Sequence, residues 1–412
     1  MIASSCSCLC LVVLLVVVLL ASPSASYECF EPESALDITK LNICNDENNA
    51  YSKLTTGPQI GYIKNQATKN NAFELSFTCD PTMDKRTCNK ARKAFIKAGA
   101  LLSKIYKFPQ KITVAAEFAD LCGASGCPPD RTIIGQAGPS RFFSMKGSDG
   151  VVRLYPQILT KFANPPGPVP YATHDIIASF NSKLASRFFL PGDKHIKPDQ
   201  VDFVAVIAHE FHHGLGLLSS WGPSGVNNVV TPFILSDDLN ILRVREVVFD
   251  QFVIRTVEGR HLTDFTKDFE KAIDGTTFTT NEALASVIED VANKNLIPTT
   301  SDYVTPDAIG FLPIGKTAIT DAVILETTLV PFAEGSTGSH VDYKTYSTSP
   351  DWLMIFRAIR GKTFQQIDKD NGAATPDTIA GPHIKAIMES IGIPTPENPN
   401  PFVPTIVNEP PV

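Results

Sequence analysis

The amino-acid sequence predicts an α+β fold organised around one apolar helix near its middle. Residues 204–216 carry apolar side chains at three- and four-residue steps, which is typical of a core helix. A similar pattern over residues 88–107 predicts a second, amphipathic helix. The region between them is mostly extended, with strands expected at 112–118, 132–137, 142–145 and 151–155. Two helices flanking such a region make an α+β domain.

The remaining elements are expected from the same kinds of pattern. Further helices are expected over 171–188, 265–273 and 281–293, and the central helix should begin near Pro198 and Asp199. Further strands are expected over 249–257 and within 309–332.

The composition limits the classes of partner. The chain of 412 residues is long enough for about two or three packed units. Its formal net charge is −7, which argues against nucleic acid or an anionic membrane surface as a partner.

The N-terminus indicates export. An unbroken apolar run covers residues 9–21, and the small residues Ser24, Ala25 and Ser26 follow it. The run is too short to span a bilayer comfortably, so residues 1–26 are expected to be a signal peptide cleaved after Ser26. No Lys or Arg precedes the run, which departs from the usual pattern. The mature protein is therefore expected to be secreted, extracellular and free of the membrane.

The cysteines fit an oxidising compartment. Six remain after the signal peptide, and an even number in a secreted chain indicates disulfides. We expect local pairs, because each closes a short loop: Cys29 with Cys44, Cys79 with Cys88, and Cys122 with Cys127.

The central helix contains the motif His-Glu-x-x-His. His209 and His213 are four residues apart, so both imidazoles project from one face of the helix and can bind one metal ion. Glu210 follows the first histidine, where it can accept a proton from the attacking water without being a ligand. Gly214 and Gly216 allow the helix to end sharply. The motif predicts the zinc site of a metallopeptidase. The alternatives are a core helix with incidental histidines and a purely structural zinc site.

A catalytic zinc site needs a third protein ligand, with the fourth position left open. The extended metzincin pattern would place that ligand at position 219, which is a serine here. His212 points about 100° away from His213 around the helix, so we expect it to support the site from behind or to lie at the surface. His340 has the strongest context, because it ends the segment Gly335-Ser-Thr-Gly-Ser-His and precedes Asp351-Trp-Leu-Met.

Three sequence blocks, at residues 209–216, 335–340 and 351–354, occur in this order and resemble those of the leishmanolysin-like metzincins. In that family an insertion separates the zinc helix from a Gly-Ser-x-x-Ser-His segment, and an Asp-x-Leu-Met stretch forms the Met-turn beneath the zinc. Residues 175–181 and 381–392 are also similar to family members. The resemblance implies one catalytic Zn²⁺ held by His209, His213 and His340, with Met354 in the Met-turn. The chain departs from the family in its 127-residue gap between His213 and His340 and in Val341 after the third histidine.

The resemblance also implies a domain organisation. The metzincin-like unit would comprise an N-terminal mixed sheet with the active-site helix and a mostly irregular C-terminal subdomain, separated by a long insertion. The expected segments are a Cys-containing cap or propeptide-like stretch (27–75), the N-terminal subdomain (76–219), the insertion (220–335), the C-terminal subdomain (336–395) and a disordered Pro-rich tail (396–412).

The expected function is a secreted, monomeric zinc-dependent endopeptidase with Glu210 as general base. Its protein or peptide substrate would lie in a cleft between the two subdomains. Three alternative functions remain: a gluzincin-type peptidase with Glu282 as third ligand, a zinc-containing binding protein without turnover, or a structural protein with incidental histidines. Weaker candidates for the third ligand are Asp250, His261 and His383.

Overall fold

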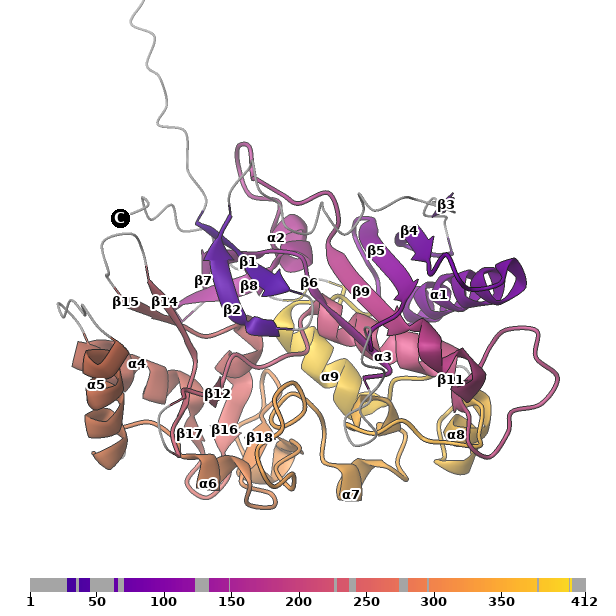
Figure 1. Cartoon of the computed structure of the whole chain (residues 1–412). Coiled ribbons are helices and arrows are strands. Elements are labelled where there is room, and N and C mark those ends of the chain that lie inside the picture. Colours follow the sequence, from indigo (N-terminus) through magenta and orange to yellow (C-terminus); the bar gives the residue numbers. More distant parts are fainter. Residues whose placement is uncertain are drawn as a thin grey trace, which may run out of the picture.

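The structure of the chain, a computed structural model, confirms the α+β class (Figure 1). It describes residues 28–34, 37–44, 63–65, 70–122, 133–147, 149–225, 228–236, 242–273, 281–294, 296–375, 378–399 and 401. The expected signal peptide and most of the expected tail lie outside these residues. Within them, no helix is both long and apolar enough to cross a bilayer.

A five-stranded mixed sheet is the framework of the N-terminal half. Its strand order is β3-β4-β5-β9-β6, with β4, β5 and β9 parallel and β3 and β6 antiparallel at the two edges. The strands are β3 (Ile63–Asn65), β4 (Phe73–Cys79), β5 (Ile112–Ala119), β9 (Ile176–Asn181) and β6 (Gly135–Pro139). Because β4 begins at Phe73, the sheet extends across the boundary expected at residue 76.

Two helices pack together beneath this sheet: α1 (Lys85–Ile105) and α3 (Phe203–Leu215) (Figure 1). The core between them is aromatic. The ring of Phe203 lies 6.0 Å from Phe95 on α1 and 5.3 Å from Phe180 on β9, both edge-on. This packing holds the helix with the His-Glu-x-x-His motif against the middle of the sheet.

The prediction of a helix over residues 171–188 is wrong. This stretch forms strand β9 and then a short 3₁₀ helix (Ser182–Arg187). All six residues of β9 are buried, because the strand lies between parallel β5 and antiparallel β6 and α3 packs against it. A short apolar run without alternation looks alike in a buried strand and a buried helix, so its pattern could not separate the two. The start expected for the central helix is also too early, because α3 begins at Phe203.

A second, antiparallel sheet lies beside the first, in the order β2-β1-β7-β8. Its strands are β1 (Cys29–Ser34), β2 (Asp37–Ile43), β7 (Phe142–Lys146) and β8 (Val152–Pro156), and α2 (Gln157–Ala163) follows β8. The N-terminal strands therefore pair directly with the domain that holds α3. A small parallel pair, β10 (Phe188–Phe189) and β11 (Val201–Asp202), leads into α3.

Residues 220–335 contain a four-stranded sheet, two-stranded pairs and helices, and part of this stretch, including Phe249, Phe265 and Phe311, belongs to the main hydrophobic core. A four-stranded sheet has the order β17-β16-β18-β19, and a smaller cluster of buried residues lies between helices α4 and α5. The elements are β12 (Gly222–Pro223), β13 (Val230–Thr231), β14 (Phe233–Ser236), β15 (Leu242–Arg245), β16 (Val253–Arg255), β17 (Arg260–His261), α4 (Leu262–Ile273), α5 (Asn281–Asn293), α6 (Thr300–Tyr303), β18 (Ile309–Phe311) and β19 (Val323–Ile324). The strand expected over 249–257 is wrong in its first half, which is a 3₁₀ helix (Val248–Phe252).

The C-terminal part has short elements joined by long irregular segments. They are α7 (Tyr343–Tyr346), a 3₁₀ turn (Trp352–Met354), α8 (Phe364–Asp370) and α9 (Pro382–Ile391). The buried residues of this part belong to the same continuous core as those of the N-terminal sheet. The polypeptide thus returns to α3 after the excursion through residues 220–335.

The disulfide expectations are confirmed where the structure describes both partners. Cys29 bonds Cys44, and Cys79 bonds Cys88. Cys122 is also disulfide-bonded, and its expected partner Cys127 lies outside the described residues.

Candidate metal centre

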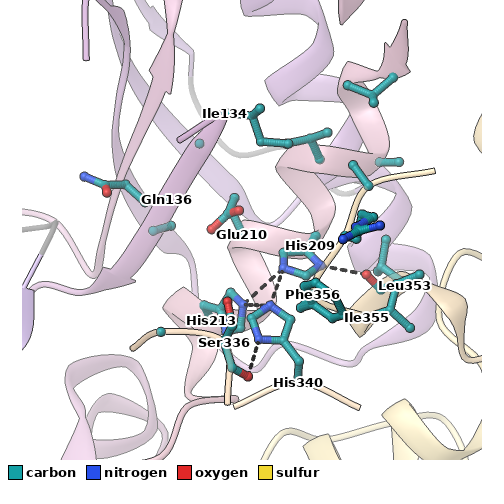
Figure 2. A pocket seen from close by; sticks show the side chains of 18 of the residues that line it. Ile134, Gln136, His209, Glu210, His213, Ser336, His340, Leu353, Ile355 and Phe356 are labelled. Atoms are coloured by element: carbon teal, nitrogen blue, oxygen red, sulfur yellow. Dashed lines mark hydrogen bonds between the residues drawn. The ribbon is translucent and has the colours of Figure 1, made fainter. Parts of the chain in front are cut away.

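Two histidines of α3 and a third that lies 127 residues later in the sequence meet in one cavity (Figure 2). The Nε2 atom of His340 lies 3.0 Å from that of His209 and 3.2 Å from that of His213, and the last two are 3.2 Å apart. Nitrogen ligands at 2.0–2.1 Å from a tetrahedral zinc ion would be separated by about 3.3 Å. The triangle therefore has the size that a zinc ion requires.

The other ring nitrogens fix the tautomers. The Nδ1 atoms of His209, His213 and His340 lie 2.6, 2.6 and 3.1 Å from the backbone carbonyls of Leu353, Leu217 and Ser336. A carbonyl only accepts, so each Nδ1 carries the proton and donates it. Each neutral imidazole then has an unprotonated Nε2, and three lone pairs converge without a proton between them. A cation is the group that satisfies them.

Burial keeps these imidazoles neutral. It lowers the pKa of His209 to about 3 and that of His213 to about 4, and the pKa of His340 also falls well below its usual value. Neutral imidazole is the form that binds a metal. The donor set, with three nitrogen ligands and an open side toward the cavity, fits the requirements of a catalytic zinc site.

The ends of α3 place the histidines. Asp202 caps its N-terminus by accepting a hydrogen bond from the backbone of Val204, at 3.0 Å. Gly216 ends it with φ of 118°, a left-handed conformation that favours glycine and turns the next carbonyl, that of Leu217, toward His213. Gly214 serves a different purpose, because a Cβ there would lie 2.5 Å from Ile176 on β9.

Glu210 projects into the same cavity as the three imidazoles (Figure 2). Burial raises the pKa of its carboxyl group to about 8, opposed by a hydrogen bond from the backbone N–H of Ala137 on β6. A doubly charged cation at the histidines would lower that pKa and favour the carboxylate. A buried carboxyl group beside a metal site, outside the ligand set, is suited to moving a proton.

The cavity has a volume of about 410 Å³ and two walls. Residues 133–137, which include part of edge strand β6, form one wall, and residues 352–359 form the other. Residues of α3 line it between them, with the histidines and Glu210. The cavity therefore lies between the N-terminal half and the C-terminal segment, as expected.

Glu326 holds the loop that carries the third histidine. Its buried carboxylate accepts hydrogen bonds from the backbone N–H groups of Thr328 at 2.7 Å and Tyr343 at 3.1 Å. Its own backbone N–H donates to the carbonyl of His340 at 2.8 Å, and its carbonyl accepts from Gly338 at 2.9 Å. Sequence reasoning missed this residue. The signal was a single acidic residue within the stretch Ala-Val-Ile-Leu-Glu-Thr-Thr-Leu-Val, since a buried charge needs local donors.

Asp250 fastens the chain that leaves α3. Its buried carboxylate accepts from the hydroxyl of Ser219 at 2.7 Å and from the backbone N–H of Ser220 at 2.9 Å. The backbone N–H of Ser219 in turn donates to the hydroxyl of Ser339 at 3.2 Å, next to His340. Asp250 was a candidate ligand in the sequence; in the structure it supports the path between the second and third histidines.

The other candidates lie elsewhere. His212 is fully buried and hydrogen-bonded to Tyr106 at 2.8 Å, so the alternative of a surface position is wrong. Glu282 is exposed on α5, and His383 bonds Asp351 at 2.8 Å near the start of α9. His261 is next to the carbonyl of Gln251. None of these four is in the histidine cluster that the described residues form.

The comparisons with known proteins identify the family. The sequence matches the SPBPB7E8-like family over residues 29–248 and 242–408. The chain belongs to that family. It is also similar to a protein of Schizosaccharomyces pombe described as "Uncharacterized protein PB7E8.01", with 25% identity over 373 residues. That match covers 81% of this chain and 65% of the relative, so the chain spans less than two thirds of the relative's length. No solved structure matches the chain.

Replacing Asp250 with alanine should destabilise the fold by about 2–4 kcal/mol, because it leaves buried hydroxyl and N–H groups of two serines without their acceptor.

The pKa of Asp250 is raised by burial to about 7, from an ordinary value of 3.8. The contribution of its protonated form is therefore fully present below about pH 3.8 and is lost as pH rises through 7. Denaturant unfolding between pH 4 and 8 should show a larger loss of stability in the parent than in Asp250→Asn, because other groups with raised pKa values, such as Glu210, titrate alike in both proteins. Equal pH profiles for the two proteins would contradict the assignment.

Proposed function

We propose that this chain is a zinc-dependent endopeptidase of the leishmanolysin-like metzincin type. The observation that carries the proposal is the convergence of three unprotonated Nε2 atoms, 3.0 to 3.2 Å apart, in a cavity that also contains Glu210. Incidental histidines would have no reason to present three lone pairs to one point. The sequence blocks at 209–216, 335–340 and 351–354 support the same assignment through their resemblance to the family.

His209, His213 and His340 would hold the zinc ion through Nε2. When bound, zinc would lower the pKa of the attacking water and polarise the scissile carbonyl. The backbone carbonyls of Leu353, Leu217 and Ser336 keep the three rings oriented, so the donor atoms need not reorganise on binding.

Glu210 would move the proton. Its carboxylate would accept the proton of the water as the water attacks, and then deliver it to the leaving amine nitrogen. The N–H of Ala137 fixes the position of that carboxylate. Met354, fully buried in the 3₁₀ turn behind His209, would act only through packing: the same turn provides the Leu353 carbonyl that orients the imidazole.

The substrate would be an extended peptide segment lying along β6. This strand is the last in the order of its sheet, and one of its outer backbone groups already faces Glu210. Antiparallel pairing with such an edge would use backbone hydrogen bonds and so suit many sequences. The opposite wall, with Ile355 and Phe356 in Figure 2, would contact the side chains of the substrate.

We further propose that the enzyme is secreted and monomeric. The disulfides in the described residues support export, since such bonds persist in oxidising compartments.

Removing the metal should abolish the activity. The full-length protein, incubated with zinc and then with a diverse library of unstructured peptides, should cleave internal peptide bonds detected by mass spectrometry. Cleavage should stop with 1,10-phenanthroline and return when zinc is added back. A zinc-loaded protein that cleaves no peptide in the library, nor unfolded casein, would contradict the proposal and favour a binding protein without turnover.

A further inference from the structure

The most basic stretch of this acidic protein begins with helix α1. Residues 85–111 contain nine Lys and Arg residues and no Asp or Glu, whereas the whole chain has a net charge of −7. The remainder of the molecule is therefore more acidic than the total suggests. A cationic segment of this length in such a chain creates a local field of opposite sign to its surroundings.

Five of these cations form one row on the outside of α1. They occur at steps of four, three, four and seven residues, which keeps them within about 60° of arc around the helix axis. The row comprises Arg86, Lys90, Lys93, Lys97 and Lys104. It extends over about 27 Å at 1.5 Å per residue. The opposite side of α1 faces the core, with Phe95, Leu102 and Ile105 buried there.

Most of the row is available to a partner. Arg86, Lys93 and Lys97 are exposed, and no ion pair of the described residues involves them. Lys90 is partly buried and pairs with Asp193. Lys97 also lies over the ring of Phe364, 5.0 Å from its centroid, a contact that does not neutralise its charge. Three cations of the row, Arg86, Lys93 and Lys97, are therefore outside the ion pairs of the described residues.

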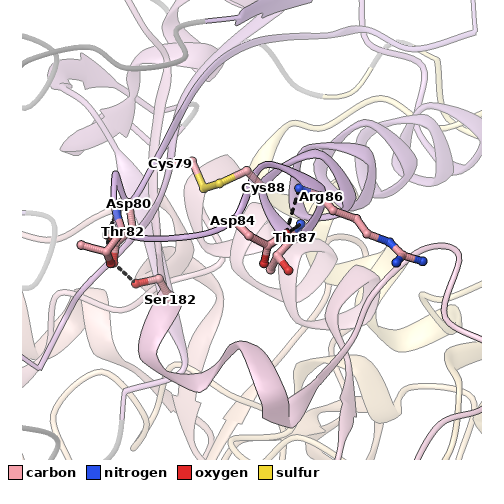
Figure 3. The surroundings of a disulfide bond; sticks show 8 residues. All are labelled: Cys79, Asp80, Thr82, Asp84, Arg86, Thr87, Cys88 and Ser182. Carbon is pink, nitrogen blue, oxygen red and sulfur yellow. Dashed lines mark hydrogen bonds between the residues drawn. A yellow bond between two sulfur atoms is a disulfide. The ribbon is translucent and has the colours of Figure 1, made fainter.

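A disulfide and a helix cap secure the start of α1 (Figure 3). The Cys79–Cys88 disulfide ties its first turns to the end of β4, and Asp84 caps it by accepting from the backbone of Arg86 and Thr87 at 2.9 and 3.0 Å. Positive side chains in a first turn oppose the helix macrodipole, so helix stability does not explain the placement of Arg86. Because the helix backbone is already in place, binding to this row requires no ordering of the main chain.

We propose that the row on α1 binds a linear sulfated polysaccharide. Because the rest of the protein is acidic, an anionic partner overcomes its repulsion only with a high density of charge along a narrow chain, which sulfate groups provide. A membrane fits less well, since no large apolar side chain of α1 is exposed to enter the bilayer. Single-stranded nucleic acid is disfavoured because the row presents no aromatic ring for base stacking. This surface is separate from the proposed metal centre.

The test uses the full-length protein on immobilised heparin, followed by titration with heparin oligosaccharides at about 0.15 M NaCl. The test variant neutralises three exposed cations of the row: Arg86→Gln, Lys93→Gln and Lys97→Gln. Its matched control removes the same charge from three exposed lysines elsewhere, each in a surface ion pair: Lys267→Gln, Lys294→Gln and Lys362→Gln. A third variant keeps the charge: Arg86→Lys, Lys93→Arg and Lys97→Arg.

The parent, the control and the charge-keeping variant should bind heparin alike, and the test variant should bind about 10- to 100-fold more weakly. Unchanged thermal unfolding of the test variant would show that the loss is not due to misfolding. The inference is overturned if the parent does not bind, or if test variant and control lose equal affinity. It is also overturned if the parent binds polygalacturonate, phosphatidylserine vesicles or single-stranded DNA more tightly than heparin.

Discussion

Replacing Glu210 with glutamine should reduce kcat by about 10³-fold and leave the zinc content unchanged. The amide has nearly the same shape and can still meet the N–H of Ala137, but it cannot accept the proton of the attacking water. Because Glu210 is not among the three converging nitrogen donors, the ion should remain bound. The measurement is turnover of a fluorogenic peptide beside elemental analysis of the same sample.

The matched control is Glu282→Gln, a conservative change at an exposed position of α5. It should keep parental kcat and parental zinc, because this glutamate lies outside the histidine cluster. A fully active Glu210→Gln protein would remove the general-base assignment. Loss of zinc from Glu282→Gln would instead revive the gluzincin-type ligand set.

Replacing His340 with alanine should weaken zinc binding by more than about 100-fold, beyond the effect of changes outside the ligand set. The substitution removes one of three nitrogen donors and leaves two on a single helix turn. It also opens the cavity where the ring now lies 3.0 Å from His209. Competition with a chromophoric zinc chelator measures the affinity, and turnover should fall with occupancy.

The control for that experiment is His383→Ala. This histidine is half-exposed, bonds Asp351 at 2.8 Å, and lies outside the cavity. Zinc affinity should stay at the parental value. If His340→Ala bound zinc as tightly as the parent, the third ligand would have to be another residue, and the resemblance that assigned it would fail.

Local patterns predicted the parts of the fold that local forces determine. Helix α5 was expected at its observed bounds, and α1, α4 and strands β5, β7 and β8 within a few residues. The pairing of Cys29 with Cys44 and of Cys79 with Cys88 also followed from short sequence separation. The distance between His213 and His340 in the sequence gave no local reason for their contact, and only the resemblance connected them.

The features that the sequence did not predict correctly all depend on contacts with distant parts of the chain. Strand β9 was expected to be helical because an apolar run buried on every side has no period that separates the two structures. The angle of about 100° from His213 left His212 either behind the site or at the surface, and helix geometry alone could not decide between them. Tyr106, just after α1, provides the hydrogen-bond partner that keeps His212 buried. The roles of Asp250 and Glu326 depend on backbone groups far along the chain, which no local pattern records.

The central claim is that three histidines of this chain form a zinc site. The most direct test is elemental mass spectrometry of the full-length protein after incubation with one equivalent of zinc and removal of unbound ions by gel filtration. The account predicts one zinc ion per chain, retained through the column and removed by 1,10-phenanthroline. A protein that elutes folded and free of zinc would contradict it.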